Sequence, residues 1–349
     1  MNFLRIILFP LVPVYAIVVK LRNLFFDKNI FKAKGVNAKV ISVGNITIGG
    51  SGKTPMVMYL VNLFRKEGSK VGVLSRGYGR KSSGYLLVSD GEKILAPVDY
   101  SGDEMYNTVS EYKIPAAVAE NRVKGAVQLL RDTGIDIILL DDAFQHRWIY
   151  RDIDILIFEQ SFLIEENLFN QSPLPAGNMR EPFESAKRAD TIIMNRKFSE
   201  VAKIPEKLKE YFKNKRIFTA YYKTIGFVDV VRNNHYGIEE FKGQKSLIVS
   251  GIAKPFSLIN ILKQTKVDTQ NQLIFKDHKN YTLREIKKIR KQFYSTNANS
   301  VVTTQKDAVK LSKFSKELDD IDIYYLKIEL KMDDEESFRN YLLDRLSFS

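Results

Sequence analysis

A glycine-rich segment near residue 50 contains the residue types that bind phosphate. Residues 44–55 read GNITIGGSGKTP and lie between an apolar run at 40–43 and an amphipathic stretch at 56–67. A strand, a glycine-rich loop and a helix N-terminus in this order let backbone N–H groups and the helix dipole surround phosphate oxygens. In that geometry Lys53 would bridge the terminal phosphates of a nucleotide, and the Thr54 hydroxyl would hold Mg²⁺.

The loop departs at one place from the strict phosphate-loop pattern G-x-x-x-x-G-K-[ST], because Thr47 occupies the first glycine position. An ordinary glycine-rich strand-to-helix turn is the alternative interpretation, and Gly-Lys-Thr in this setting favours phosphate binding. The segment predicted to bind ATP consists of Thr47, Ile48, Gly49, Gly50, Ser51, Gly52, Lys53 and Thr54.

A phosphate loop needs an acidic metal partner at the end of a neighbouring strand. The apolar run at 137–140 leads directly into Asp141 and Asp142, and we expect Asp141 to bind Mg²⁺ or its waters. Gln145 and His146 follow within the same segment. They would lie just beyond the carboxyl end of the strand, where open α/β sheets bind their ligands.

From about residue 38 the sequence alternates short apolar runs with helical stretches, which predicts a doubly wound, mostly parallel α/β sheet of the P-loop NTPase type. Buried strands are predicted at 40–43, 71–74, 137–140, 153–158 and 191–194. Near residue 216 the runs become aromatic and β-branched, and a turn-rich stretch follows at 233–237. A second, smaller α/β domain joined by a β-strand hinge is therefore predicted.

The predicted domains begin with an apolar N-terminal anchor helix and continue with a P-loop domain, a β hinge and a second α/β domain. Their ranges are 1–28, 29–215, 216–245 and 246–349. In the second domain we predict strands at 247–250, 300–303 and 323–330, the last of which could return beside 216–222, and helices at 254–263, 282–293 and 335–346.

The composition limits the classes of function. The 349 residues include 54 Lys plus Arg against 41 Asp plus Glu, a net charge of +13 that suits nucleic acid, nucleotides or an anionic lipid surface. Cysteine is absent, which excludes disulfides, thiolate nucleophiles and cysteine-based metal sites. With 3 histidines in the chain, a multi-histidine metal site is not expected.

The N-terminus is unusually apolar, because residues 6–19 carry no charge and are interrupted only by Pro10 and Pro13. As a helix this run would span about 21 Å, short of the ~30 Å hydrocarbon core of a bilayer. With the apolar residues that follow, and with Lys20 and Lys28 near its end, it is typical of an interfacial anchor. A buried core helix is one alternative; a signal peptide is another, although the segment has no A-x-A cleavage site.

Together these features resemble the tetraacyldisaccharide 4'-kinase family, the lipid A 4'-kinases. The resemblance implies ATP- and Mg²⁺-dependent phosphorylation of the 4'-hydroxyl of an acylated disaccharide 1-phosphate, which yields lipid IVA in lipid A biosynthesis. It also implies a peripheral or monotopic protein at the cytoplasmic face of the inner membrane, with no nucleic-acid partner and no obligate protein partner. The matching segments are the apolar N-terminus and residues 44–55, 75–78, 102–104, 141–147, 174–182, 277–278 and 304–310.

The resemblance also implies roles for individual residues. Asp103 would be the catalytic base for the sugar hydroxyl, with His278 of the second domain as its partner and Lys53 on the phosphates. Glu104 and Asp142 would join Thr54 and Asp141 in the metal site. The residues expected to meet the lipid's sugar and phosphate are Arg76, Tyr78, Asn178 and Arg180, beside Gln145 and His146.

Two other classes of protein share some of these features. A deviant phosphate-loop ATPase or GTPase that acts on a protein partner normally has a lysine where this chain has Ile48, and a guanine-specific N-K-x-D segment is absent. A nucleic-acid-binding protein would suit the charge of +13. However, the basic residues are spread along the chain, and no nucleic-acid-binding module is recognisable.

Overall fold

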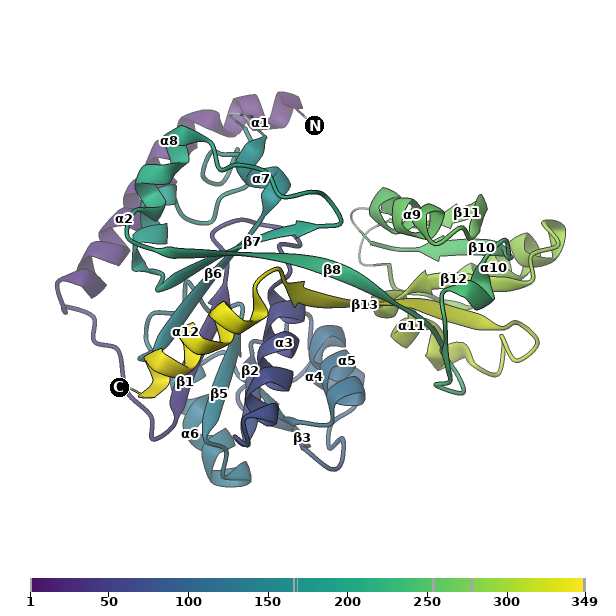
Figure 1. Ribbon diagram of the computed structural model, residues 1–349, viewed down its shortest axis with the longest axis horizontal. Helices are drawn as coiled ribbons and strands as arrows, with labels where there is room; N and C mark the ends of the chain where they lie inside the picture. The colour runs from purple at the N-terminus through teal and green to yellow at the C-terminus, as the bar shows by residue number, and fades with distance from the viewer. Residues whose placement is uncertain (1, 166, 168, 253–254, 277–278, 348–349) are drawn as a thin grey trace. The chain divides into compact units, whose positions relative to one another are not determined.

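The computed structural model describes the chain apart from residues 1, 166, 168, 253–254, 277–278 and 348–349 (Figure 1). Internal contacts divide it into two units. The first consists of Met1–Tyr222 and Leu330–Ser349, and the second of Lys223–Glu329. Each unit is an α/β structure, and the strands of both belong to one continuous strand order.

In the first unit the neighbouring strands from β8 to β4 are parallel, and β3 runs antiparallel to β4. The chain order and the spatial order differ, which is the mark of a doubly wound sheet. In order across the sheet the strands are β8 (Arg216–Asp229), β7 (Thr191–Lys197), β6 (Ile153–Glu159), β1 (Lys39–Gly44), β5 (Ile137–Asp141), β2 (Val71–Ser75), β4 (Pro115–Val118) and β3 (Leu86–Asp90).

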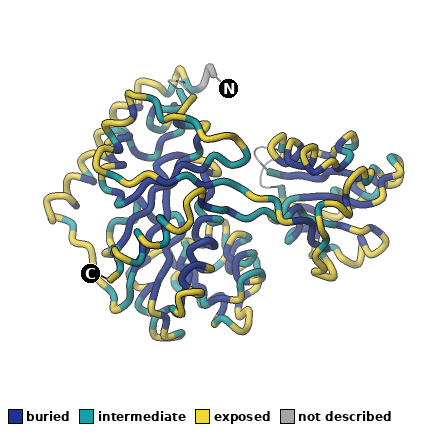
Figure 2. Tube along the Cα trace, in the orientation of Figure 1, coloured by how far each residue is buried: buried dark blue, intermediate teal, exposed yellow. Residues whose placement is uncertain are grey.

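Helices cover both faces of this sheet, so its central strands are buried on both sides (Figure 2). Ile41 and Val43 of β1 belong to the apolar cluster under α3, α5 and α12, whereas Val40 belongs to the cluster under α6. This alternation follows from the two-residue repeat of a strand. The helices are α3 (Lys53–Lys66), α4 (Val98–Ser101), α5 (Asp103–Tyr112), α6 (Arg122–Thr133), α7 (Gln160–Ile164), α8 (Glu206–Lys209) and α12 (Glu335–Ser347), with 3-10 turns η2 (Phe183–Arg188) and η3 (Glu210–Phe212).

The apolar N-terminus forms α1 (Asn2–Leu8), η1 (Phe9–Leu11) and α2 (Val12–Asp27) in immediate succession. Pro10 and Pro13 lie in the first turns of η1 and α2, where the missing N–H of proline leaves no helical hydrogen bond unmade. The buried residues of α2 follow a helical spacing and mark one face, made of Val12, Val19, Asn23 and Phe26.

The second unit has the strand order β11, β10, β12, β13, β8, and β9 pairs with β8. β8 and β13 each continue from one unit into the other and are neighbours in the strand order. Its further elements are β9 (His235–Tyr236), β10 (Lys245–Ser250), β11 (Asp268–Ile274), β12 (Ser300–Thr304), β13 (Ile323–Met332), α9 (Pro255–Gln264), α10 (Leu283–Ser295) and α11 (Gln305–Leu311), with 3-10 turns η4 (Glu239–Phe241) and η5 (Ser312–Phe314).

Candidate active site

The glycine-rich loop connects β1 to α3. Its shape is fixed by hydrogen bonds within the loop and by a hydrogen bond from β7. Asn45 Nδ2 donates to Thr47 Oγ1 at 3.2 Å and to Ser51 Oγ at 3.0 Å. From β7, Asn195 Nδ2 donates to the Ser51 carbonyl at 3.0 Å. These contacts hold the loop in one conformation before any ligand binds, which reduces the entropy lost on phosphate binding.

Gly52 precedes Lys53, the first residue of α3, and has φ 102°, a backbone conformation that favours glycine. A Cβ at this position would also lie 2.8 Å from the Tyr222 hydroxyl and would collide with the Asn195 side chain. Sequence reasoning missed Asn45, Asn195 and Tyr222. Asn195 could have been predicted from the sequence, because it directly follows a predicted buried strand. Open α/β sheets bind their ligands at the carboxyl ends of such strands.

Thr54 and Asp141 meet at the carboxyl ends of neighbouring strands. β1 and β5 are parallel with Val43 opposite Asp141, so Asp141 lies at the foot of the loop that follows β1. Thr54 Oγ1 donates to Asp141 Oδ2 at 2.9 Å. The other carboxylate oxygen of Asp141 is buried with no hydrogen-bond partner among the described residues. The Thr54 hydroxyl and the Asp141 carboxylate supply oxygen atoms, which are the ligands that Mg²⁺ prefers. These two residues therefore fit the ion.

Burial and the neighbouring carboxylates of Glu104 and Asp142 raise the pKa of Asp141 to about 7. Glu104 therefore lies close enough to Asp141 to act on it electrostatically. No group of three or more Asp, Glu or His side chains that could hold a metal is found within the described residues. Mg²⁺ commonly uses only one or two protein carboxylates and takes its remaining ligands from phosphate and water.

Asparagine in place of Asp141 is expected to remove a pH-dependent loss of stability. Because the pKa of about 7 in the fold exceeds the ordinary value of 3.8, folding loses stability as the pH rises between these values. The melting temperature of the wild type in EDTA should therefore fall, relative to that of Asp141→Asn, from about pH 5 to about pH 8. Added Mg²⁺ should stabilise only the wild type. A difference in melting temperature that does not vary with pH would contradict this expectation.

The Asp142 carboxylate pairs with two positively charged side chains, those of Arg180 and Lys53. Its Oδ1 lies 2.9 Å from Arg180 Nη1 and 3.8 Å from Lys53 Nζ, and the same Arg180 nitrogen donates to Oδ2 at 3.0 Å. Asp142 has φ 52°, so the chain turns sharply at the end of β5. The carboxylate predicted for the metal site is thus ion-paired both to the phosphate-loop lysine and to a predicted substrate residue.

Residues 178–181 lie against the phosphate loop, although some 130 positions separate them in sequence. Ile48 N–H donates to the Asn178 carbonyl at 2.8 Å, and Arg180 N–H donates to the Ile46 carbonyl at 2.7 Å. Thr47 and Met179 form an isolated antiparallel bridge between these two contacts. Predicted nucleotide-binding and predicted lipid-binding residues therefore share one backbone pairing.

Asp103 and Glu104 are the first two residues of α5, directly after Gly102, whose φ is 84°. A Cβ on Gly102 would lie 2.9 Å from the Tyr78 carbonyl, so the loop after β2 and the start of α5 approach closely. Tyr78 itself is 81% exposed. Acidic residues are common in the first turn of a helix, where they face the positive end of the helix dipole.

His146 lies among arginines. Burial, followed by the charges of Arg122 and Arg151, lowers its pKa to about 4, so the imidazole is neutral near pH 7. Its Nε2 is buried with no hydrogen-bond partner in the described part of the chain. Arg76 contributes to the same lowering and so lies near this imidazole. Gln145 Nε2 donates to the Asn45 carbonyl at 2.8 Å, which connects this segment to the phosphate loop.

The structure brings most of the predicted site residues together at the carboxyl ends of the parallel strands of the first unit. His278, predicted as the partner of Asp103, and Asp277 beside it lie outside the described residues. In the second unit, the buried Asp307 accepts hydrogen bonds from Gly251 N–H, Tyr281 OH and Thr304 Oγ1 at 2.9, 3.1 and 2.8 Å. This part of the 304–310 segment is tied into its own unit.

The fold and the site define a nucleotide-binding protein of the phosphate-loop class. A family model described as tetraacyldisaccharide-1-P 4'-kinase matches residues 4–347. The chain belongs to this family, which confirms the resemblance seen in the sequence. Among solved structures it is similar to LpxK from Aquifex aeolicus in complex with ATP, with a TM-score of 0.81 and 28% identity over 98% of this chain and 99% of that chain. This likeness confirms the predicted fold class.

Curated relatives named tetraacyldisaccharide 4'-kinase are similar over almost their whole lengths. The protein of Chlorobium limicola is 33% identical, with coverage of 100% of this chain and 99% of the relative. That of Halothermothrix orenii is 34% identical over 93% of this chain and 88% of the relative. That of Flavobacterium psychrophilum is 33% identical over 100% and 99%. The similarity therefore covers both units.

Proposed function

We propose that this chain transfers the terminal phosphate of ATP to the 4'-hydroxyl of a tetraacyldisaccharide 1-phosphate, the reaction for which its family is named. The observation that carries the proposal is the pairing of residues 46–48 of the phosphate loop with residues 178–180 of the predicted lipid-binding segment. A kinase must place its acceptor beside the terminal phosphate of the donor, because phosphoryl transfer is catalysed mainly by positioning and charge stabilisation.

Lys53, Thr54 and Asp141 would serve the donor side of the reaction. The Lys53 ammonium would compensate charge on the terminal phosphates, and it lies at the N-terminus of α3, whose dipole acts in the same direction. Thr54 Oγ1 and Asp141 would hold Mg²⁺, with Glu104 and Asp142 close to that site. Mg²⁺ bound with the nucleotide neutralises charge on the phosphate oxygens.

Asp103 would serve the acceptor side as the base that takes the proton of the attacking hydroxyl. The support is its position in the first turn of α5, next to Glu104. The charge of Glu104 raises the pKa of Asp141, so this end of α5 lies near the proposed metal site. A base in this position must stay ionised and still accept a proton as the new P–O bond forms. Predicted contacts to the lipid's sugar and phosphate come from Arg76, Tyr78, Gln145, His146, Asn178 and Arg180.

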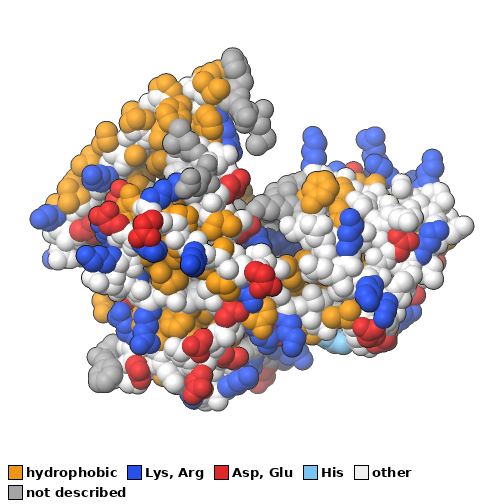
Figure 3. All heavy atoms as spheres, turned by 45° about the horizontal axis from the view of Figure 1, so that its top comes forward, with side chains coloured by type: hydrophobic (Ala, Val, Ile, Leu, Met, Phe, Trp, Pro, Cys, Tyr) orange, Lys and Arg blue, Asp and Glu red, His pale blue; other side chains and the backbone are white. Residues whose placement is uncertain are grey.

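The lipid acceptor requires access to a membrane, and the N-terminal helix would provide it. The most apolar 18-residue window of the helix over Arg5–Asp27 has a mean hydropathy of 1.7, and 11% of that window is buried in the protein. By length and composition this helix could cross a bilayer. Hydrophobic side chains gather along it in Figure 3. The exposed ones are Ile6, Ile7, Phe9, Leu11, Val14, Ile17, Val18, Leu21, Leu24 and Phe25.

The contacts that the other side of this helix makes with the protein favour an interfacial anchor over a helix that spans the bilayer. Arg5 Nη2 donates to Asn178 Oδ1 at 3.1 Å, and Tyr15 OH donates to the Arg180 carbonyl at 2.9 Å. Near the end of α2, Asn23 Nδ2 donates to Glu181 Oε2 at 2.8 Å. A helix bound along its length to the protein body buries one face in the protein and leaves the other for the lipid surface. The cytoplasmic face of the inner membrane is the proposed location.

The test is to incubate the purified protein with labelled ATP and the disaccharide 1-phosphate lipid. We expect a bis-phosphorylated lipid that depends on Mg²⁺. ATP turnover that responds to a protein partner or to DNA, with no phosphorylated lipid, would instead favour a regulatory ATPase or a nucleic-acid-binding protein. The lipid product distinguishes these classes because only a lipid kinase forms a phosphate ester on the sugar.

Serine in place of Val14, Ile17 and Leu21 is expected to lower binding to anionic vesicles by about tenfold or more, because three exposed apolar side chains leave the lipid-facing side. Sedimentation with sucrose-loaded vesicles measures the bound fraction. ATP binding should not change. A matched control replaces the exposed Ile94 and Leu95, away from this helix, with serine and should bind vesicles normally. Unchanged vesicle binding by the triple variant would refute the anchor.

A further inference from the structure

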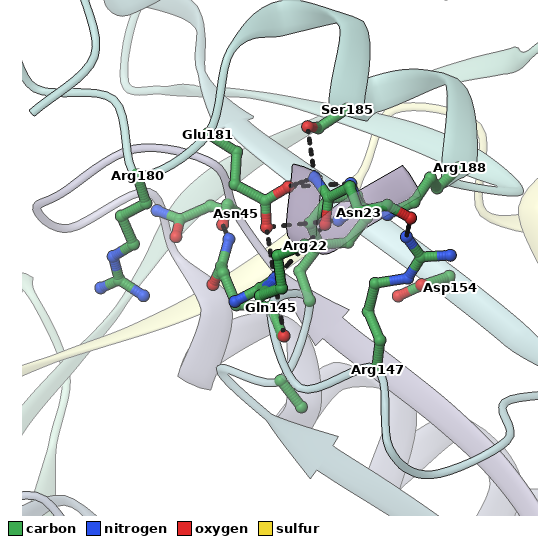
Figure 4. A network of polar contacts seen from close by, with 12 residues as sticks. Arg22, Asn23, Asn45, Gln145, Arg147, Asp154, Arg180, Glu181, Ser185 and Arg188 are labelled. Carbon is green, nitrogen blue, oxygen red and sulfur yellow. Dashed lines mark hydrogen bonds and ion pairs between the residues drawn. The ribbon is translucent and has the colours of Figure 1, made fainter. Parts of the chain in front are cut away.

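Asn23 is a buried polar residue on α2, a helix whose opposite face is apolar and exposed. It is 8% exposed, and its amide donates to Glu181 Oε2 at 2.8 Å and to Ser185 Oγ at 3.4 Å. Beside it, Arg22 Nη2 lies 3.5 Å from Glu181 Oε1. A buried amide costs free energy unless it is hydrogen-bonded, so an apolar residue would suffice here if α2 only needed to pack. The amide makes a specific link between α2 and Glu181 (Figure 4).

Glu181 is the point at which these contacts converge. Its side chain is 1% exposed, and Arg188 Nη1 donates to Oε2 at 2.8 Å while Arg188 Nη2 donates to Oε1 at 3.3 Å. Burial alone would favour the neutral acid, but the ion pair with Arg188 and the hydrogen bonds from Arg188 and Asn23 hold the pKa of Glu181 below its ordinary value. A buried anion fixed by several donors has little freedom to move.

The backbone around Glu181 leads directly to the phosphate loop. Arg180 N–H and Glu181 N–H both donate to the Ile46 carbonyl, at 2.7 and 3.4 Å. The Arg180 guanidinium donates to both oxygens of Asp142, at 2.9 and 3.0 Å. Tyr15 of α2 holds the Arg180 carbonyl from the other side. Residues 180–181 are therefore fixed between the N-terminal helix and the phosphate loop.

A second set of contacts runs from α2 to the same loop. Arg22 Nη2 donates to the Gln145 carbonyl at 3.1 Å, and Gln145 Nε2 donates to the Asn45 carbonyl at 2.8 Å. Asn45 in turn donates to Ser51 inside the loop. Two short series of hydrogen bonds thus connect α2 to the site, and they start from Asn23 and Arg22 (Figure 4).

We propose that Asn23 and Glu181 are positioning residues, through which the buried face of the anchor helix sets the place of Arg180 beside Asp142 and the phosphate loop. The proposal rests on the proposed lipid kinase function. The helix then has two separable tasks: its exposed face binds the lipid surface and its buried face orders the site. Deleting residues 1–26 would remove both at once, so that truncation cannot distinguish anchoring from positioning.

The test begins with Asn23→Leu, which keeps the number and branching of the side-chain heavy atoms and removes the donor to Glu181 and Ser185. Because displacement of an acceptor-binding group lowers the fraction of productive complexes, kcat with detergent-dispersed lipid should fall by about tenfold. The affinity for ATP should stay within about twofold of the wild-type value. Amide hydrogen exchange in a peptide covering 178–181 should become about fivefold faster or more, and this readout needs no lipid substrate.

The matched control is Leu24→Ser, a change at the next residue but on the exposed face, where Leu24 is 44% exposed. It should weaken vesicle binding and leave exchange in 178–181 at the wild-type rate. Trp148, the chain's only tryptophan, packs against Phe26 at 4.9 Å between ring centroids and reports whether α2 stays docked. Its emission should be unchanged in both variants, and Asn23→Leu should retain wild-type vesicle binding.

Glu181→Gln completes a double-variant cycle. If Asn23 acts through Glu181, the two effects on kcat should combine to much less than their product. A lower melting temperature with wild-type kcat and wild-type exchange would make Asn23 a purely structural residue and overturn the proposal, as would effects that multiply. If the wild type phosphorylates no lipid while Asn23→Leu still speeds exchange in 178–181, the proposed function fails and the positional link stands.

Discussion

Alanine in place of Lys53 is expected to lower kcat for phosphate transfer by about a thousandfold or more while the protein stays folded. Lys53 is the first residue of α3, at the end of the loop that Asn45 and Asn195 hold in shape. Its side chain is 13% exposed and lies 3.8 Å from Asp142, so its ammonium is directed into the site. The variant loses a positive charge where negative charge increases during transfer.

The measurement is the rate of labelled phosphate transfer from ATP to the lipid, with circular dichroism and the melting temperature as checks on folding. Lys66→Ala is the matched control, because Lys66 is an exposed lysine in the last turn of the same helix and should retain full activity. Thr54→Ala should show a comparable loss, since it removes the hydroxyl that contacts Asp141. Near-normal turnover in Lys53→Ala would refute the phosphate-loop assignment.

Alanine in place of Asp103 is expected to lower kcat by at least about a hundredfold, the scale for loss of general base catalysis. Asp103 belongs to α5 rather than to the phosphate loop, so the affinity for ATP should change little. The loss should therefore appear in kcat and not in nucleotide binding, which equilibrium binding of a fluorescent ATP analogue can measure separately.

Asp99→Ala controls for the loss of a nearby carboxylate, because Asp99 lies in the preceding short helix and pairs with Lys81 on the surface. Activity should be retained in this variant. Asp103→Asn should be nearly as impaired as Asp103→Ala, since the amide keeps the size of the side chain but cannot accept the proton. A loss confined to ATP binding would remove Asp103 from the role of base.

Sequence patterns predicted the central strands of the first unit because those strands are buried on both faces and read as continuous apolar runs. Ile137–Asp141 and Ile153–Glu159 are examples. Pro115–Val118 and Asp268–Ile274 were not predicted, since the first is very short and the second has mixed burial and is polar from Asp268 to Gln272. Strand β8 is continuous over Arg216–Asp229 and so extends beyond the run at 216–222 that the sequence indicated.

For the candidate site, the sequence by itself determined the glycine-rich loop and the acidic end of β5. It also predicted the helix that follows the loop, although α3 begins at Lys53 rather than at residue 56. Each depends on consecutive residues: glycines permit the turn, Lys53 and Thr54 begin the helix, and an apolar run ends at Asp141. Local backbone geometry follows from local sequence, so these features can be read without knowing the fold.

Only the tertiary structure decided which distant residues complete the site. Asn195 shapes the phosphate loop, Arg180 pairs with Asp142, and Asn23 meets Glu181, in each case across many positions in sequence. Polar pairs of this kind have no periodicity, because a hydrogen bond needs only two atoms at the right distance and angle. Those distances exist only once the strands and the N-terminal helix have packed, so packing rather than pattern determines them.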